Sequence, residues 1–152
     1  MSCGAKRQVN RVRAAIGGMT VLGLTVLVPL ASTRAAAPPR EGVVAYVIDG
    51  DTVRLASGER IRIAGIDAPE TRADNAKCKA EIALGKQASA QARALLEGRR
   101  VTVIRVGRSY DRTVAHLKIG GRDAAKALVA SGAARWWPRG AERPRWCPTR
   151  DR

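Results

Sequence analysis

The sequence predicts an α+β fold in which a five-stranded β-barrel with two helices follows a signal peptide. Short runs of β-branched residues, separated by turn signals, lie on both sides of one long helical pattern. The chain has 152 residues, enough for one ordinary domain. Its apolar residues are mostly aliphatic and include no Phe, so we expect a modest core.

The strands before the helix are expected to form a meander. They are predicted over residues 43–48, 52–55 and 61–66. Asp49-Gly50 and Ser57-Gly58 are turn signals between them, and Arg62 should face opposite to its apolar neighbours because strand side chains alternate. Pro69 cannot donate a hydrogen bond in a central strand, so residues 67–79 are predicted to be a long loop.

The helical pattern comes next and has apolar residues at a period of 3.6. Its inward face should consist of Leu84, Ala88, Ala92, Leu95 and Leu96, and Gly98 should end the helix. Two more strands are expected, over residues 101–106 and 114–119, with His116 as an ordinary strand residue. Asp123 can cap a second helix that ends at Ser131-Gly132 and buries Ala124, Ala127 and Leu128. Five strands with a helix between the third and fourth suit a closed barrel of the OB type.

The chain begins with the pattern of a targeting segment. Four basic residues precede an uncharged stretch over residues 14–31, and small residues follow at 35–37. We interpret residues 1–37 as a signal peptide, so that the domain is secreted or periplasmic; an uncleaved membrane anchor with the domain outside the cytosol is the alternative. Residues 38–41 are then a linker, residues 42–137 the domain, and residues 138–152 a tail rich in Pro and Arg.

The charge of the domain does not depend on this leader. Residues 1–37 hold five Lys or Arg and no acid, which leaves 23 bases against 13 acids and a formal charge of +10. Such a surplus attracts polyanions. A solvated basic surface, or one that binds anionic lipid or cell wall, would carry the same charge, so charge alone does not select nucleic acid.

Two cysteines remain once the leader, with Cys3, is set aside. In an oxidising compartment, Cys78 and Cys147 are most simply interpreted as one disulfide that ties the loop around Lys77 to the tail. Metal binding by these cysteines is less favoured, because His116 is the only histidine in the chain.

Acids and arginines are grouped around the expected turns. Asp51 follows the first turn, Asp67 and Glu70 follow the third strand, and Arg62 and Arg112 lie in that strand and on a later loop. Two carboxylates with carbonyl and water oxygens suit a hard cation such as Ca²⁺, and a third carboxylate can orient or deprotonate a water. Two guanidiniums can hold the oxygens of a phosphodiester under attack.

Three motifs in order carry a family resemblance. Residues 48–53 (IDGDTV), 61–71 (IRIAGIDAPET) and 110–112 (YDR) resemble the staphylococcal nuclease (thermonuclease) family, and the similarity covers roughly residues 42–137. The resemblance implies an OB-fold barrel with helices and a Ca²⁺-dependent nuclease that acts on DNA and RNA. It implies no stable protein partner, and we expect a monomer.

The resemblance also implies roles for single residues. Asp51 and Asp67 resemble the calcium-binding carboxylates, and the backbone carbonyl of Ala68 resembles a further ligand. Glu70 resembles the general base or water-positioning carboxylate. The phosphate-binding arginines correspond to Arg62 and Arg112, and Tyr110 resembles a tyrosine that helps bind the substrate phosphate.

Other residues have two interpretations. Asp111 adds a negative charge beside Arg112, which either weakens phosphate binding or holds that arginine in place. Trp136 and Trp137 can stack on bases, but we favour packing at the end of the barrel. Arg99, Arg100, Arg105 and Arg108 either extend a phosphate-binding surface or are scattered surface charge.

Two other functions compete with a nuclease. The first is a noncatalytic OB-fold module of the cell envelope that binds nucleic acid or another polyanion. The second is a structural envelope protein held by its leader. Neither needs Asp51, Arg62, Asp67, Glu70 and Arg112 together, so we favour the enzyme.

Overall fold

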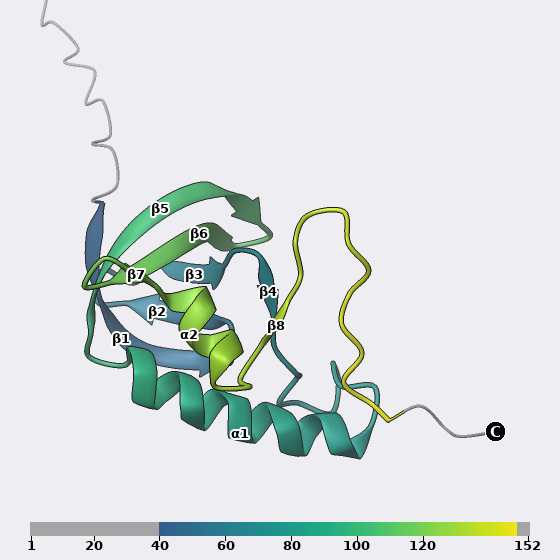
Figure 1. Ribbon diagram of the computed structural model, residues 1–152. Coiled ribbons are helices and arrows are strands. Elements are labelled where there is room, and N and C mark those ends of the chain that lie inside the picture. The colour runs from purple at the N-terminus through teal and green to yellow at the C-terminus, as the bar shows by residue number, and fades with distance from the viewer. Residues whose placement is uncertain (1–39, 149–152) are drawn as a thin grey trace, which may run out of the picture. The chain divides into compact units, whose positions relative to one another are not determined.

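The structure, a computed structural model, describes residues 40–148 (Figure 1). The expected signal peptide therefore lies outside the described residues. Within the described range no helix combines the length and apolarity needed to cross a bilayer. The elements are β1 (Glu41–Asp49), β2 (Thr52–Leu55), β3 (Arg60–Ile63), β4 (Ile66–Asp67), α1 (Lys79–Leu96), β5 (Arg100–Ser109), β6 (Arg112–Ile119), β7 (Arg122–Asp123), α2 (Ala124–Ala130) and β8 (Arg135–Trp136).

Five of these strands close on one another. β1 pairs antiparallel with β2 and with β5, β2 pairs with β3, and β5 pairs with β6. The parallel pairing of β3 with β6 completes the circuit. α1 connects β3 and β4 to β5 and runs beneath the barrel in Figure 1. The arrangement agrees with the expected barrel of the OB type.

The third strand differs from its prediction. Residues 61–66 were expected to be one strand, but the chain turns at Ala64-Gly65, where Gly65 has a φ of 78°. That left-handed conformation favours glycine and breaks the strand. Ile66 and Asp67 then form β4, which pairs with β8. Asp67 is therefore held in a short ladder and does not begin a loop.

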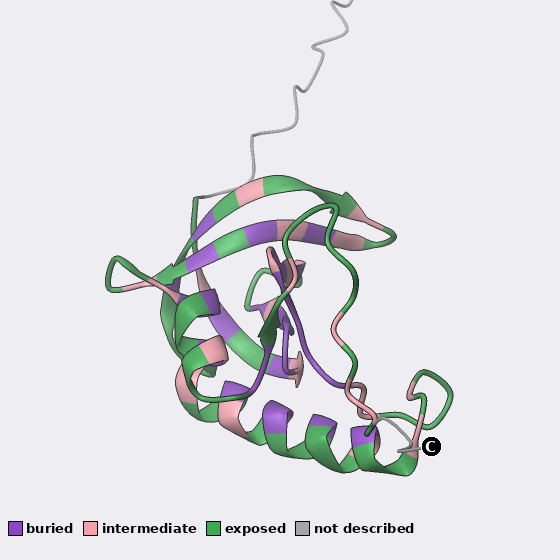
Figure 2. Ribbon diagram, turned by 45° about the vertical axis from the view of Figure 1, so that its right-hand side comes forward, coloured by how far each residue is buried: buried purple, intermediate pink, exposed green. Residues whose placement is uncertain are grey.

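α1 packs on the barrel through small residues, and its purple inward face is visible in Figure 2. Ala88, Ala92 and Leu96 are buried as expected, but Leu84 is 40% exposed, so its predicted place on that face is wrong. Gly85 takes the inward position instead, where the backbone of the Pro69-Glu70 segment lies too close for a side chain. Gly98 follows the helix with a φ of 74°, which confirms the expected end.

α2 is shorter than α1, and Asp123 caps it as predicted. The Asp123 carboxylate accepts hydrogen bonds from the backbone N–H groups of Ala125 (2.8 Å) and Lys126 (3.4 Å). Ala124 and Leu128 are buried, whereas Ala127 is exposed and Ala125 is buried in its stead. The buried face therefore consists of Ala124, Ala125 and Leu128, so the predicted burial of Ala127 is wrong.

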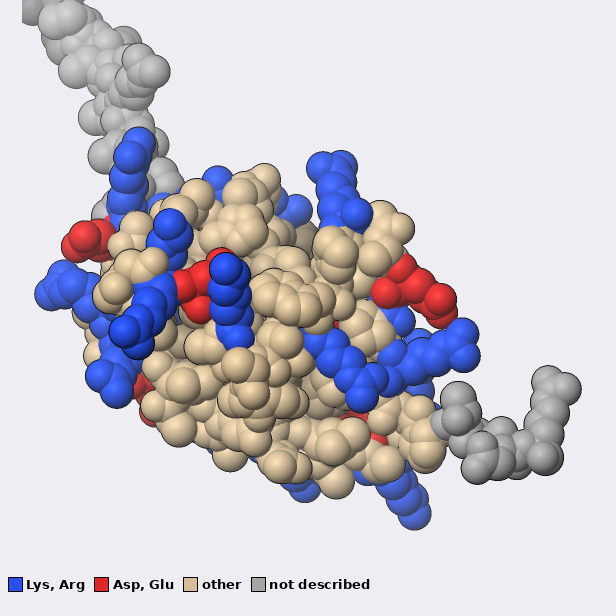
Figure 3. Space-filling view, in the orientation of Figure 1, with Lys and Arg blue, Asp and Glu red and all other residues tan. Residues whose placement is uncertain are grey.

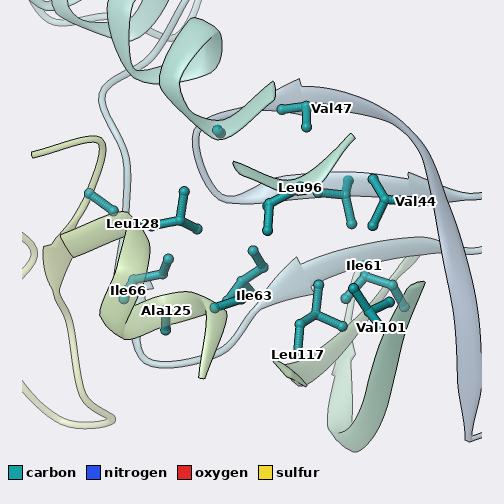
Figure 4. Close-up of a cluster of buried hydrophobic side chains, with 14 of the residues drawn as sticks. Val44, Val47, Ile61, Ile63, Ile66, Leu96, Val101, Leu117, Ala125 and Leu128 are labelled. Carbon is teal, nitrogen blue, oxygen red and sulfur yellow. The ribbon is translucent and has the colours of Figure 1, made fainter. Parts of the chain in front are cut away.

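The core is aliphatic and fills the barrel (Figure 4). Ile61, Ile63 and Leu117 point inward from strands, and Leu96 and Leu128 close it from the two helices. Burial of such side chains supplies the main favourable term in folding. Trp136 is 51% exposed, so the prediction that it packs the end of the barrel is wrong.

Candidate active site

One cavity gathers the residues that the sequence singled out. It measures about 330 Å³ and lies where β1, β3, β4 and the β5–β6 turn meet. Its lining includes all seven expected site residues, namely Asp51, Arg62, Asp67, Ala68, Glu70, Tyr110 and Arg112. Asp49, Pro69, Ser109, Trp137 and Arg143 complete it.

Asp51 lies at the bottom of this cavity. Its side chain is 9% exposed and accepts hydrogen bonds from the Thr52 hydroxyl and the Ala68 N–H, both at 2.9 Å. Burial raises the pKa of the Asp51 carboxyl to about 7; Arg62 acts against this rise, and the charge of Asp49 adds to it. The effect of burial on this pKa is thus larger than the opposing effect of Arg62, so the arginine alone does not fully compensate the charge of the carboxylate.

Arg62 is fixed by the strand that carries it. It pairs with Thr52 on one side of β3 and with Val114 on the other. Its Nη1 donates to the carbonyls of Ile63 (3.1 Å) and Ile66 (2.9 Å) and lies 2.9 Å from Asp51 Oδ2. Its Nη2 lies 3.7 Å from Asp67 Oδ1, so one guanidinium faces both buried carboxylates.

Asp67 is completely buried, and its contacts include residues that sequence reasoning missed. Arg143 Nε donates to Asp67 Oδ1 at 2.9 Å, and Trp146 Nε1 donates to Oδ2 at 2.8 Å. Arg143 Nη2 also donates to Glu70 Oε1 at 2.9 Å. The disulfide between Cys78 and Cys147 is present as predicted and brings this tail to the site. The predicted bridge was the signal that could have found both residues.

The segment that carries Glu70 rests on α1. Glu81 is buried; its carboxylate accepts hydrogen bonds from the N–H groups of Lys77 (2.8 Å) and Glu70 (3.4 Å). At Gly85 a Cβ would come within 2.3 Å of the Glu70 carbonyl oxygen. Both residues were missed, although they share the helical phase of the buried Ala88 and Ala92.

The turn between β5 and β6 carries the remaining candidates. Arg112 begins β6 opposite Ser109, and Tyr110 is 92% exposed with a φ of 54°. Asp111 pairs with Arg60, which resolves the two interpretations of its charge. The carboxylate faces Arg60 on β3, so it is neither a partner that holds Arg112 in place nor an unpaired charge beside the phosphate site.

Arg105 is one of the four arginines with two interpretations, and it has a defined partner. Arg105 forms a two-point ion pair with Glu59, at 3.0 and 2.5 Å, and the hydrogen bond from Arg105 is the main reason that the pKa of Glu59 is lowered. Arg105 therefore has a structural partner inside the barrel wall. Figure 3 shows Lys and Arg side chains mainly around the rim of one face, some beside acids, as scattered surface charge would be.

The donor set fits a hard divalent cation. Asp51 and Asp67 are buried carboxylates that face one guanidinium, and the raised pKa of Asp51 reflects incomplete neutralisation. Ala68 lines the same cavity, and its N–H donates to Asp51. Oxygen ligands of this kind are what Ca²⁺ prefers. The separate cluster of Cys78, Glu81 and Cys147 is not comparable, because its sulfurs form the disulfide.

Comparison with known proteins agrees with this geometry. The family described as Staphylococcal nuclease homologue matches residues 60–144, more than half of the chain. The match includes Arg62, Asp67, Glu70 and Arg112 and reaches Arg143 in the tail. Among curated proteins, none matches the chain. Domains of this family are generally nucleases, or modules that bind nucleic acid. On its residues, its barrel and this match, the chain belongs to the staphylococcal nuclease homologue family.

Proposed function

We propose that the protein is an exported, Ca²⁺-dependent nuclease that hydrolyses phosphodiester bonds in DNA and RNA. The observation that carries this proposal is the convergence of Asp51, Arg62, Asp67, Glu70 and Arg112 on one cavity, from segments far apart in the sequence. A binding module needs basic and aromatic residues, but it has no need of two buried carboxylates beside a third. The N-terminal leader pattern supports export, and we propose a monomer.

Two of these carboxylates would hold the cation. Asp51 and Asp67 would bind Ca²⁺ together with the carbonyl of Ala68. When bound, such an ion supplies a Lewis acid that polarises a phosphoryl oxygen. Arg62 lines the same cavity and faces both carboxylates, with Nη1 2.9 Å from Asp51 and Nη2 3.7 Å from Asp67.

Glu70 would take the role of base. It lies on a segment that Glu81 and Gly85 hold against α1, so its backbone has a fixed place. Its carboxylate would accept a proton from, or orient, the attacking water. Arg112 and Arg62 would stabilise charge that develops on the phosphate oxygens, and Tyr110 would contact the substrate phosphate from the exposed turn.

Digestion tests this proposal directly. Single-stranded DNA, duplex DNA and RNA are incubated with the full chain in Ca²⁺, in Mg²⁺ and in chelator, beside Glu70→Gln. Glu41→Gln is the matched control because Glu41 is an exposed acid at the start of β1. We expect cleavage only with Ca²⁺ and a loss of about a hundredfold or more in Glu70→Gln, with the control unchanged. Cleavage that is equal in both variants would contradict the proposal.

A second candidate function has one observation in its favour. Arg143 and Trp146 donate hydrogen bonds to Asp67, and Arg143 also donates to Glu70. These carboxylates thus already have partners within the protein, as carboxylates with a structural role do. A noncatalytic module that binds nucleic acid would show salt-dependent binding of the same substrates without cleavage under any of these conditions.

A further inference from the structure

The tail contributes Arg143 to the lining of the cavity and contacts two of its carboxylates. We call residues 138–148 the C-terminal strap. Its Arg143 bridges Asp67 and Glu70 through two 2.9 Å hydrogen bonds, and its Trp146 donates to the other oxygen of Asp67. Both oxygens of Asp67 thus have partners from the strap. A guanidinium is a cation, so it occupies oxygens that a divalent cation would also need.

One covalent bond and several polar contacts tie the strap to the rest of the protein. The disulfide fixes Cys147 to Cys78, with 6.1 Å between their Cα atoms. Arg135 of β8 donates to the Arg145 carbonyl at 2.6 Å, and its guanidinium lies 4.3 Å from the centre of the Trp146 ring. The Trp137 indole donates to the Ala141 carbonyl at 2.9 Å.

The strap is not packed as a core would be. None of the strap residues 138–148 is buried. A cavity of about 500 Å³ is bounded by strap residues on one side and by Lys77 and Glu81 on the other. Segments with little buried apolar surface are displaced at low cost in free energy. The strap therefore can leave the carboxylates without unfolding the barrel.

We propose that the C-terminal strap is a built-in competitor for the cation, in which the Arg143 guanidinium takes the place of the divalent ion at Asp67 and also pairs with the base, Glu70. This inference rests on the proposed function, since it concerns the same carboxylates. The Cys78–Cys147 disulfide keeps Arg143 close and so raises its effective concentration at the site. Cation binding displaces Arg143, and the bridge determines how strongly Arg143 competes.

Calorimetric titration of the full chain with Ca²⁺ tests the inference without any cleavage assay. Four proteins are compared: the natural chain, Arg143→Ala, Cys78→Ser/Cys147→Ser, and the triple variant. We expect Ca²⁺ to bind about tenfold more tightly to Arg143→Ala. The double serine variant should gain about threefold. The triple variant should bind no more tightly than Arg143→Ala alone, because the disulfide acts only through that arginine.

Arg145→Ala is the matched control. It removes one positive charge from the same strap, but Arg145 pairs with the exposed Glu142 and with neither Asp67 nor Glu70. Its Ca²⁺ affinity should remain within about twofold of the natural chain. A gain as large as that of Arg143→Ala would overturn the inference in favour of general electrostatic repulsion.

Other results overturn the inference in distinguishable ways. Equal Ca²⁺ affinity in the natural chain and Arg143→Ala, with Ca²⁺-dependent cleavage intact, refutes the competitor and leaves the nuclease standing. Weaker binding in Arg143→Ala means that the arginine supports the site, which also refutes it. If no protein in the set binds Ca²⁺, both proposals fail. Thermal unfolding checks each variant, and Arg143→Lys, with an expected intermediate gain, replaces the alanine variant if that one does not fold.

Discussion

Asp67 is approached by two arginines that belong to different regions of the molecule. Arg62 projects from β3, which is paired on both sides, and its side chain is 14% exposed. Arg143 projects from the strap, and its side chain is 40% exposed. Yet Arg143 lies at 2.9 Å from Asp67 and Arg62 at 3.7 Å. Although Arg143 is the closer of the two, it lies on an exposed strap, whereas Arg62 lies on a strand that is paired on both sides. We therefore expect a ligand to displace Arg143 more easily than Arg62.

The largest effect should follow from removal of the fixed arginine. Arg62→Ala leaves Asp51 buried without its guanidinium, so we expect a loss of roughly 3 kcal/mol in the free energy of unfolding. Cleavage should fall by about a hundredfold or more, because a transition-state contact is lost. Urea unfolding and digestion measure the two effects. If Arg143→Ala is as damaging as Arg62→Ala, the contrast between the two regions does not hold.

The next effect concerns the floor of the site. Alanine normally stabilises a helix relative to glycine, but Gly85→Ala would force the Glu70 backbone away from α1. We expect a loss of about 2 kcal/mol in stability and a clear loss of cleavage as Glu70 moves. Gly107→Ala is the control, since a Cβ there meets nothing within 4 Å. A Gly85→Ala protein as stable and active as the control would show that this segment adapts.

A third prediction concerns how Asp51, the partner of Arg62, makes the stability of the protein depend on pH. The pKa of Asp51 is about 7 in the folded chain, above its ordinary 3.8, so the folded state binds the proton more tightly. Protonation of Asp51 therefore stabilises the folded state at low pH. This contribution is lost as pH rises toward 7, and the free energy of unfolding falls by up to about 1.4 kcal/mol per pH unit. Urea midpoints without Ca²⁺ should therefore fall from pH 5 to pH 8.

Asp51→Asn is the control for this pH series, because it cannot lose the proton and should lack that decline. Ca²⁺ should bind more weakly below pH 7 in the natural chain, since cation and proton compete for Asp51. A natural chain whose midpoint does not change between pH 5 and pH 8 would show that Arg62 neutralises Asp51 after all.

The smallest effect lies in the barrel wall away from the site. Glu59→Gln weakens the pair with Arg105 and the hydrogen bond from Thr113, at an expected cost of about 1 kcal/mol. The pKa of Glu59 is lowered by the hydrogen bond from Arg105, so this contribution is present above pH 4.5 and is lost as pH falls. Cleavage should not change. A large drop in cleavage would mean that Arg105 serves the substrate.

Local sequence patterns predicted the barrel and the part of the candidate site that the barrel carries. The turn at Asp49-Gly50, the alternation around Arg62 and the cap at Asp123 are encoded within a few residues, and each was confirmed. Asp51, Arg62 and Arg112 line one cavity because β3 pairs with β2 on one side and with β6 on the other, and the expected barrel already placed the first hairpin beside the third strand.

Contacts between distant segments were not predictable in the same way. Leu84 looked buried by its apolar character, but the close approach of Glu70 reserves that face for Gly85. After the break at Gly65, Ile66 and Asp67 pair with β8, a strand of two residues without a pattern of its own. Arg143 and Trp146 lie in a segment with no periodicity, and only the expected disulfide pointed to their position.

The parallel pairing of β3 with β6 also affects when activity can arise. Asp51 and Arg62 precede α1 in the chain, whereas Arg112 opens β6, so the cavity is complete only after β6 has paired with β3. A chain still emerging from the ribosome has no assembled site. If the protein is the proposed nuclease, the cell that makes it is protected from it during synthesis, because catalysis would require the folded barrel.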